Sequence, residues 1–207
     1  MLQSLTEMLI ALPAIMIALV FHEYAHGKVA DLLGDTTPYY QGRLTLNPLP
    51  HIDWLGFIML FVFHFGWAKP VQVNPYNFKN ISIKKGMMLV SLAGPGMNIL
   101  LAFIGLLAYK YLAPLQNLEW AAMTISLIQP LIYINLILAA FNLIPLPPLD
   151  GSKILAGLLP DTGAQYIYSL EQYGPLILLL LIVSGMAGKI FMPLANLLYS
   201  LLTMIVF

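Results

Sequence analysis

The stretch MLIALPAIMIALVFHEYAHG, residues 8–27, decides how this chain folds. Its first fourteen residues, 8–21, carry no charge, and the segment 8–33 is 26 residues long with one proline. A helix rises about 1.5 Å per residue, so about 20 residues cross a hydrocarbon core of about 30 Å. We therefore expect residues 8–33 to form a membrane-spanning helix that carries two histidines and a glutamate.

The composition indicates an integral membrane protein whose main partner is the lipid bilayer. Of the 207 residues, 60% are hydrophobic and 9% are charged, whereas soluble domains carry roughly a quarter charged residues. The formal net charge of zero argues against a surface that binds nucleic acid. The first apolar run has no basic segment before it and no small-residue cleavage site, so we expect it to be retained as a span.

Other apolar runs predict further membrane segments. Residues 86–112 and 120–144 are each long enough to span, and residues 173–207 are expected to form a hairpin that turns at residues 184–189. Residues 54–67 reach only about 21 Å as a helix, so a re-entrant path is expected. The predicted fold is an all-α integral membrane protein with five to six membrane segments in a single domain, residues 1–207.

Two polar segments alternate in the manner of short strands. Residues 42–46, GRLTL, and residues 71–73, VQV, are bounded by Pro, Asn and Gly. They could pair as a small β-hairpin beside the end of the first span, and the alternative is that both are surface loops.

Lysines indicate the orientation in the membrane. Lys69, Lys79, Lys84 and Lys85 crowd the connection before residue 86, and the positive-inside rule places such a connection in the cytoplasm. The next two spans then return residues 145–172 to the same side. A site at the end of the first span would open toward the cytoplasm, with Asp31 and Asp35 marking a polar access route or only the end of the helix.

The first chemical motif is H-E-x-x-H. His22 and His26 are four residues apart, so on a helix they share one face and can direct ring nitrogens at one Zn²⁺, while Glu23 is placed to hold a water. A pair of core histidines is the alternative. Three ionisable residues within a span cost a few kcal/mol or more, which favours a metal. The chain has no cysteine, so imidazole and carboxylate must be the ligands.

The second motif is NLIPLPPLDG, residues 142–151. Its three prolines cannot continue a helix, so the chain is expected to run extended and to present Asp150. Asp150 would be the third zinc ligand, and two imidazoles with one carboxylate leave a position for water, as in catalytic zinc sites. The alternative role for Asp150 is to cap the following helix.

Four other polar residues each have alternative roles. His51 and His64 have no histidine or carboxylate four residues away, so loop or core roles are expected for both. Asn98 lies in an apolar span and needs a hydrogen-bond partner, either a histidine or the substrate. Asn142 is a candidate donor to the oxyanion, or it satisfies carbonyls freed by the prolines.

These motifs resemble the site-2 protease family of intramembrane zinc metalloproteases. The resemblance covers FHEYAHG at 21–27, GRLTLNPLPHID at 42–53, GWAKPVQVNP at 66–75, AGPGMN at 93–98 and FNLIPLPPLDG at 141–151. It implies zinc on His22, His26 and Asp150, Glu23 as general base, and supporting roles for Asn98 and Asn142. It is nearest to the compact bacterial and archaeal branch without a PDZ domain, which implies a prokaryotic cell membrane. The apolar run 54–67 departs from that pattern.

The resemblance implies hydrolysis of peptide bonds in or near the transmembrane segments of membrane proteins, as in regulated intramembrane proteolysis. Two alternatives belong to other classes. A zinc or proton transporter would also place His, Glu and Asp inside spans, but it would show polar stations along a path and matched repeats, and no repeat is visible. A non-catalytic membrane chaperone would keep the scaffold without the reaction.

Overall fold

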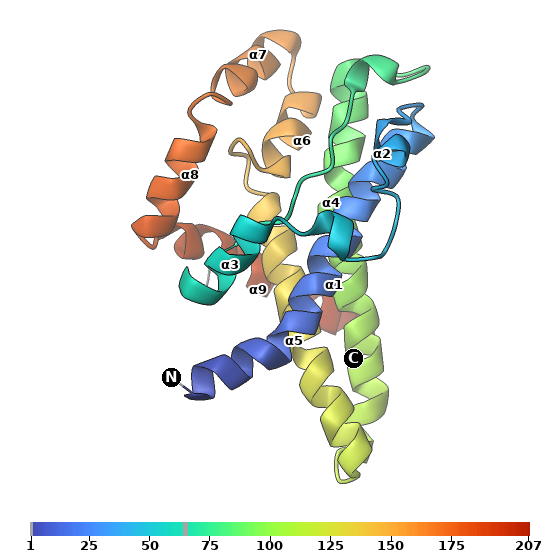
Figure 1. Ribbon diagram of the computed structural model, residues 1–207, viewed down its shortest axis with the longest axis vertical. Coiled ribbons are helices and arrows are strands. Elements are labelled where there is room, and N and C mark those ends of the chain that lie inside the picture. The colour runs from blue at the N-terminus through green and yellow to red at the C-terminus, as the bar shows by residue number, and fades with distance from the viewer. Residues whose placement is uncertain (1, 64–65) are drawn as a thin grey trace.

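The computed structural model describes residues 2–63 and 66–207, and every regular element within them is a helix (Figure 1). Four of the described helices are long and apolar enough to cross a membrane: α1 (Leu2–Leu32), α4 (Ile83–Leu112), α5 (Glu119–Asn142) and α9 (Met186–Val206). A bent pair, α7 (Asp161–Ser169) and α8 (Gly174–Val183), would be a fifth span despite its 64° angle. The all-helical membrane fold is confirmed, whereas the predicted number of five to six segments is not.

The shorter elements lie in the connections between the long helices. They are α2 (Thr37–Tyr40), η1 (Leu49–His51), α3 (Trp54–Phe63), η2 (Pro75–Asn77) and α6 (Asp150–Leu158), while η3 (Ala113–Leu115) connects α4 to α5. Figure 1 shows the end of α1, the start of α4, and helices α6 and α7 in its upper part, and the α4–α5 connection at the bottom. The connections that the lysines predicted to be cytoplasmic therefore lie together.

The centre of the fold is built from helices that approach each other through small residues. Ala18 in α1, Ala102 in α4 and Ala139 in α5 are fully buried, and small side chains allow the backbones of membrane helices to pack closely. An apolar cluster on α4, α5 and α9 continues the packing with Ala102, Leu106, Ile132, Leu136, Leu202 and Val206. This core holds α1, α4 and α5 in a fixed arrangement around the polar groups that follow.

The predicted β-hairpin is absent from the described residues. Neither 42–46 nor 71–73 forms a strand, and the isolated antiparallel bridge in this region joins Ile52 to Ala68. The physical reason is Arg43, whose buried guanidinium donates from Nη1 to Pro50 O at 2.9 Å and from Nη2 to Lys69 O. The segment thus folds around the Arg43 side chain. The alternation of residue types that predicted a strand reflects this buried arginine.

The residues that flank the apolar segment 54–67 contact each other. The Ile52–Ala68 bridge flanks α3, and the amide of Lys69 donates to His51 O at 2.9 Å. Helix α3 has ten residues, about 15 Å of helix, which is too short to cross a hydrocarbon core. Because the two ends of the segment meet, its geometry agrees with the predicted re-entrant path.

The predicted break in the last apolar run is a turn between α8 and α9. Gly185 has φ 70°, in the left-handed region that glycine adopts without steric cost. The amide of Gly185 donates to Ile182 O at 3.0 Å and closes the end of α8.

Candidate metal centre

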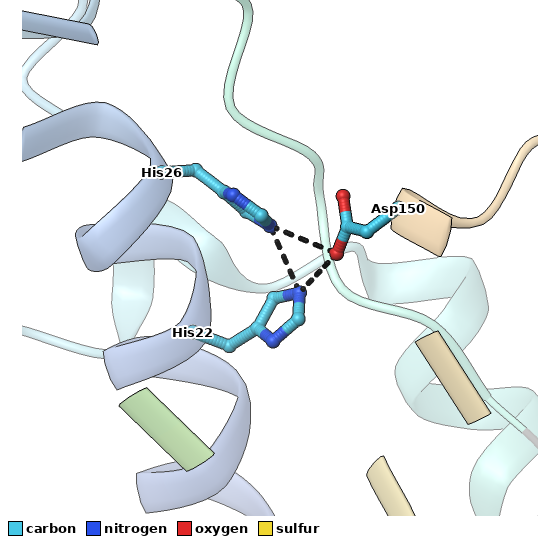
Figure 2. A group of neighbouring side chains, drawn as sticks. All are labelled: His22, His26 and Asp150. Atoms are coloured by element: carbon cyan, nitrogen blue, oxygen red, sulfur yellow. Dashed lines mark hydrogen bonds and ion pairs between the residues drawn. The ribbon is translucent and has the colours of Figure 1, made fainter. Parts of the chain in front are cut away.

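Three predicted ligand residues converge on one point between α1 and α6 (Figure 2). The Nε2 atoms of His22 and His26 are 3.0 Å apart, and each lies 3.3 Å from Oδ2 of Asp150. All three side chains are largely buried. The structure thus brings together residues that are more than 120 positions apart in the sequence, as the two motifs predicted.

The proline-rich segment presents Asp150 in the way the sequence suggested. After α5 ends at Asn142, Pro145, Pro147 and Pro148 prevent a continuous helix, and α6 begins at Asp150. The residue at the N-cap position is Leu149, so Asp150 is not the cap, and its carboxylate is turned toward the histidines. A Cβ at Gly151 would lie 2.3 Å from Ile144 O, so only glycine fits beside this carboxylate.

Hydrogen bonds to the other ring nitrogens decide which imidazole atoms carry protons. His26 Nδ1 is 2.7 Å from Val90 O, and His22 Nδ1 is 2.7 Å from Asn98 Oδ1. Both partners are acceptors, so each Nδ1 must be the N–H donor and each Nε2 presents a lone pair. Two ring lone pairs therefore face each other and a carboxylate oxygen.

This donor set fits zinc. Asp150 Oδ2 is buried and accepts no hydrogen bond, which follows if both neighbouring nitrogens present lone pairs. Tetrahedral zinc with bonds of about 2.0–2.1 Å separates its ligand atoms by about 3.3–3.4 Å, close to the observed 3.0–3.3 Å. A cation at this point would satisfy all three ligand atoms at once.

Glu23 lies beside the three ligand residues in the same cavity. The cavity has a volume of about 260 Å³ and is lined by residues from α1, α4, α5, α6 and the segment 70–73, including Glu23, Asn142 and Lys153. Glu23 Oε2 accepts a hydrogen bond from the amide of Val71 at 2.8 Å. The loop that follows segment 54–67 thus fixes the direction of the Glu23 carboxylate.

Helix α4 passes the histidines at Gly94. A Cβ placed there would lie 2.5 Å from His26 Nε2 and 2.6 Å from His22 Cε1. The motif AGPGMN was interpreted as a place of close helix packing, and in the structure the close contact is with the two imidazoles.

The supporting asparagines differ in their contacts. Asn98 is fully buried and bonded to His22, the kind of partner that its place in an apolar span required. Asn142 lines the cavity, but its Nδ2 donates to Leu138 O of its own helix at 3.0 Å. That carbonyl precedes the prolines by a full turn or more, so Asn142 does not satisfy a carbonyl that they freed.

Other predicted residues lie elsewhere. His51 is 2% exposed, donates from Nε2 to Thr45 O at 2.9 Å, and lines a separate apolar cavity of about 540 Å³. Burial lowers the pKa of His51 and outweighs the hydrogen bond to Thr45, so the ring is neutral near pH 7. His51 is not among the described residues whose ligand atoms converge. His64 lies outside the described residues.

The suggested polar access route is not formed by Asp35. Its buried carboxylate accepts hydrogen bonds from Thr37, Asn74 and Asn77, which tie the end of α1 to the loop before α4. Asp31 pairs with Lys28 at 3.1 Å. Both carboxylates are therefore engaged in structural contacts.

Two residues near the centre were missed by sequence reasoning. Asn135 is a fully buried amide in α5 that bonds to Asn98, and the signal was an isolated asparagine within an apolar span. Lys153 lies within residues 145–172, for which the sequence predicted only the side of the membrane, yet it lines the cavity. Its position three residues after Asp150 places it on the same face of α6.

Comparisons with known proteins identify the family. The sequence model of Peptidase family M50 matches residues 112–183. A Bacillus subtilis relative, "Putative zinc metalloprotease YwhC", is 40% identical over 187 residues, which cover 88% of this chain and 84% of the relative. A similarly named protein of Methanocaldococcus jannaschii, MJ0611, is 31% identical over 73% of this chain and 72% of its own. Another, Rip2 of Mycobacterium tuberculosis, is 30% identical over 82% of this chain and 64% of its own. No solved structure matches the chain.

Proposed function

This chain belongs to peptidase family M50, the site-2 proteases, and from that premise we propose that His22, His26 and Asp150 hold its zinc ion and that Glu23 is its general base. The protein is an intramembrane zinc metalloprotease. The observation that supports the residue assignment most directly is the convergence of the two Nε2 atoms and Asp150 Oδ2 within 3.3 Å.

The chain's own residues then have distinct tasks in hydrolysis. A zinc ion held by His22, His26 and Asp150 would lower the pKa of a bound water toward about 7 and would polarise the scissile carbonyl. Glu23 accepts the proton from the attacking water and passes it to the leaving amine. The Val71 amide holds the Glu23 carboxylate toward the cavity. Asn142, whose Nδ2 bonds within α5, is the candidate to rotate and donate to the oxyanion.

The substrate is a transmembrane protein, cleaved in or near its membrane segment. We place the active site toward the cytoplasm in a prokaryotic cell membrane, with residues 1–207 acting as one membrane domain. Support comes from the lysine-rich connection before α4, which lies at the same end of the molecule as Lys153 and the cavity. Regulated intramembrane proteolysis is the process that fits this arrangement.

Two substitutions distinguish the role of a general base from that of a zinc ligand. Glu23→Gln keeps size and hydrogen-bonding reach but cannot accept a proton, so zinc should stay bound while cleavage falls by about 10²- to 10⁴-fold. Asp150→Ala removes a ligand and should lower the metal content itself. Zinc per chain and cleavage of a membrane-spanning reporter are measured for each purified variant.

Three outcomes would contradict the proposal. Full cleavage by Glu23→Gln would exclude Glu23 as the base, and unchanged zinc affinity in Asp150→Ala would exclude Asp150 as a ligand. Zinc flux across vesicles without cleavage by any variant, the parent included, would indicate a transporter.

A further inference from the structure

Asn135 is a polar side chain buried completely in the middle of α5, and it does not line the metal cavity. Its Nδ2 donates to Leu131 O, one turn earlier in the same helix, at 2.8 Å. That bond turns its Oδ1 toward α4, where it accepts from Asn98 Nδ2 at 2.8 Å. The orientation of the Asn135 amide is therefore set within its own helix.

Asn98 transfers this orientation to His22. Its Nδ2 has a second acceptor, Ala18 O at 3.0 Å, so both N–H groups of the amide are used. The opposite side of the amide, Oδ1, then faces His22 Nδ1 at 2.7 Å. The chain of bonds runs from α5 through α4 to α1 without leaving the buried interior.

An asparagine amide can rotate by 180° with little change in shape, because its oxygen and nitrogen are nearly equal in size. The rotated Asn98 would set its oxygen against two acceptors and offer an N–H to His22 Nδ1. The imidazole proton would then sit on Nε2, where it would block the metal. Ala18 O and Asn135 Oδ1 together disfavour this state.

We propose that Asn135 is a positioning residue of the metal centre, which holds the Asn98 amide so that His22 keeps its proton on Nδ1 and its lone pair on Nε2. The inference rests on the proposed zinc site. A purely structural role, in which Asn135 only joins α4 to α5, predicts different results in the experiment that follows.

The experiment measures the zinc dissociation constant of the full-length chain in detergent by competition with a chelator. Asn135→Leu has similar size but leaves one Asn98 N–H without an acceptor. Loss of an outer partner of a metal ligand weakens binding by about 10- to 100-fold, and we expect about 10-fold for this more remote residue. Asn135→Asp, protonated when buried, retains an acceptor for Asn98 and a donor for Leu131 O, and it should stay within about threefold of the parent.

The control is Leu136→Ala, which opens a cavity at the neighbouring buried position in the α4–α5–α9 cluster. It should lower thermal stability while leaving zinc affinity within about twofold of the parent. If it weakens zinc binding as much as Asn135→Leu does, Asn135 acts through packing and the inference is wrong. Thermal unfolding verifies that each variant is folded, and Asn135→Ala replaces the leucine variant if the latter does not fold.

A double-mutant cycle tests the route through Asn98. In an Asn98→Leu background, Asn135→Leu should change zinc affinity by less than about twofold, because the amide that it orients is gone. Fully additive effects would overturn the inference, as would an Asn135→Leu variant that binds zinc as tightly as the parent. If the parent itself binds no zinc, the proposed site is wrong and the inference falls with it.

Discussion

At the scale of single residues, Gly94 determines how closely α4 can approach the two histidines. Any side chain there would overlap the imidazole atoms, since a Cβ would come within 2.5–2.6 Å of both rings. Gly96 lies two positions further along the same helix, and a Cβ there would meet nothing within 4 Å. Alanine substitutions at these two glycines therefore separate the steric effect of an added methyl group from its effect on helix propensity.

We expect Gly94→Ala to lose at least about tenfold in zinc affinity, because the added methyl group must displace His22 or His26 from the ligand geometry. Gly96→Ala should retain zinc and activity and gain up to about 1 kcal/mol in helix stability. Zinc per chain and reporter cleavage are measured for both variants. Equal zinc binding by the two would show that the α4 backbone can move away without cost.

The residues of the site differ in how readily the sequence predicts them. His22, His26 and Asp150 could be predicted because ligand spacing and prolines are local patterns that carry a specific chemistry. Asn135 could not be assigned a partner, because a lone asparagine in an apolar helix shows only that some partner is needed. Its partner, Asn98, lies 37 positions away on another helix.

At the scale of elements, Asp35 fixes the end of α1 to the loop that leads into α4. Burial alone would raise the pKa of Asp35, but hydrogen bonds from Thr37, Asn77 and Asn74 outweigh burial and hold the pKa below its usual value of 3.8. The carboxylate form is therefore the one that the folded protein stabilises. This stabilisation is complete above the unfolded pKa and is lost as the pH falls through the lower folded pKa.

We expect Asp35→Asn to reduce the free energy of unfolding by about 1–3 kcal/mol at pH 7, because the new NH₂ group would replace a buried oxygen that accepts hydrogen bonds from Thr37, Asn74 and Asn77. Asp31→Asn, which affects only the pair with Lys28, should cost about 0.5 kcal/mol or less. Thermal unfolding in detergent at pH 7 and at pH 3 is the measurement. The gap between parent and Asp35→Asn should narrow below about pH 3.8, and a gap that is independent of pH would contradict the role of the charge.

The elements also show where sequence patterns were ambiguous. The long apolar runs predicted α1, α4 and α5 because about 20 consecutive apolar residues match the length of a membrane-spanning helix. The alternation at 42–46 predicted a strand, but it arises here from Arg43, which is buried and occupies two carbonyls. An arginine between apolar residues gives the same sequence pattern in a strand and in a loop folded around a buried guanidinium, so the pattern could not distinguish these two structures.

At the scale of the whole molecule, the direction of the helices can be tested with single cysteines, since the chain has none of its own. Lys79→Cys and Thr36→Cys lie at the same end, where the Lys79 amide donates to Leu33 O at 2.7 Å. Gln116→Cys lies at the far end of α4. The first two should react with an impermeant thiol reagent only from the cytoplasmic side, and the third only from the other side. Labelling of positions 36 and 79 from opposite sides would exclude the re-entrant path.

The bridge between Ile52 and Ala68 has a consequence for biogenesis. The residues next to it, Asp53 and Lys69, are charged, and carrying either across the bilayer would cost a few kcal/mol. Because the bridge holds the two ends of the segment together, Asp53 and Lys69 stay on the same side of the bilayer. Neither charge then has to be translocated when α3 enters the lipid. The segment can therefore be inserted as a closed loop that keeps both charges on one side of the bilayer.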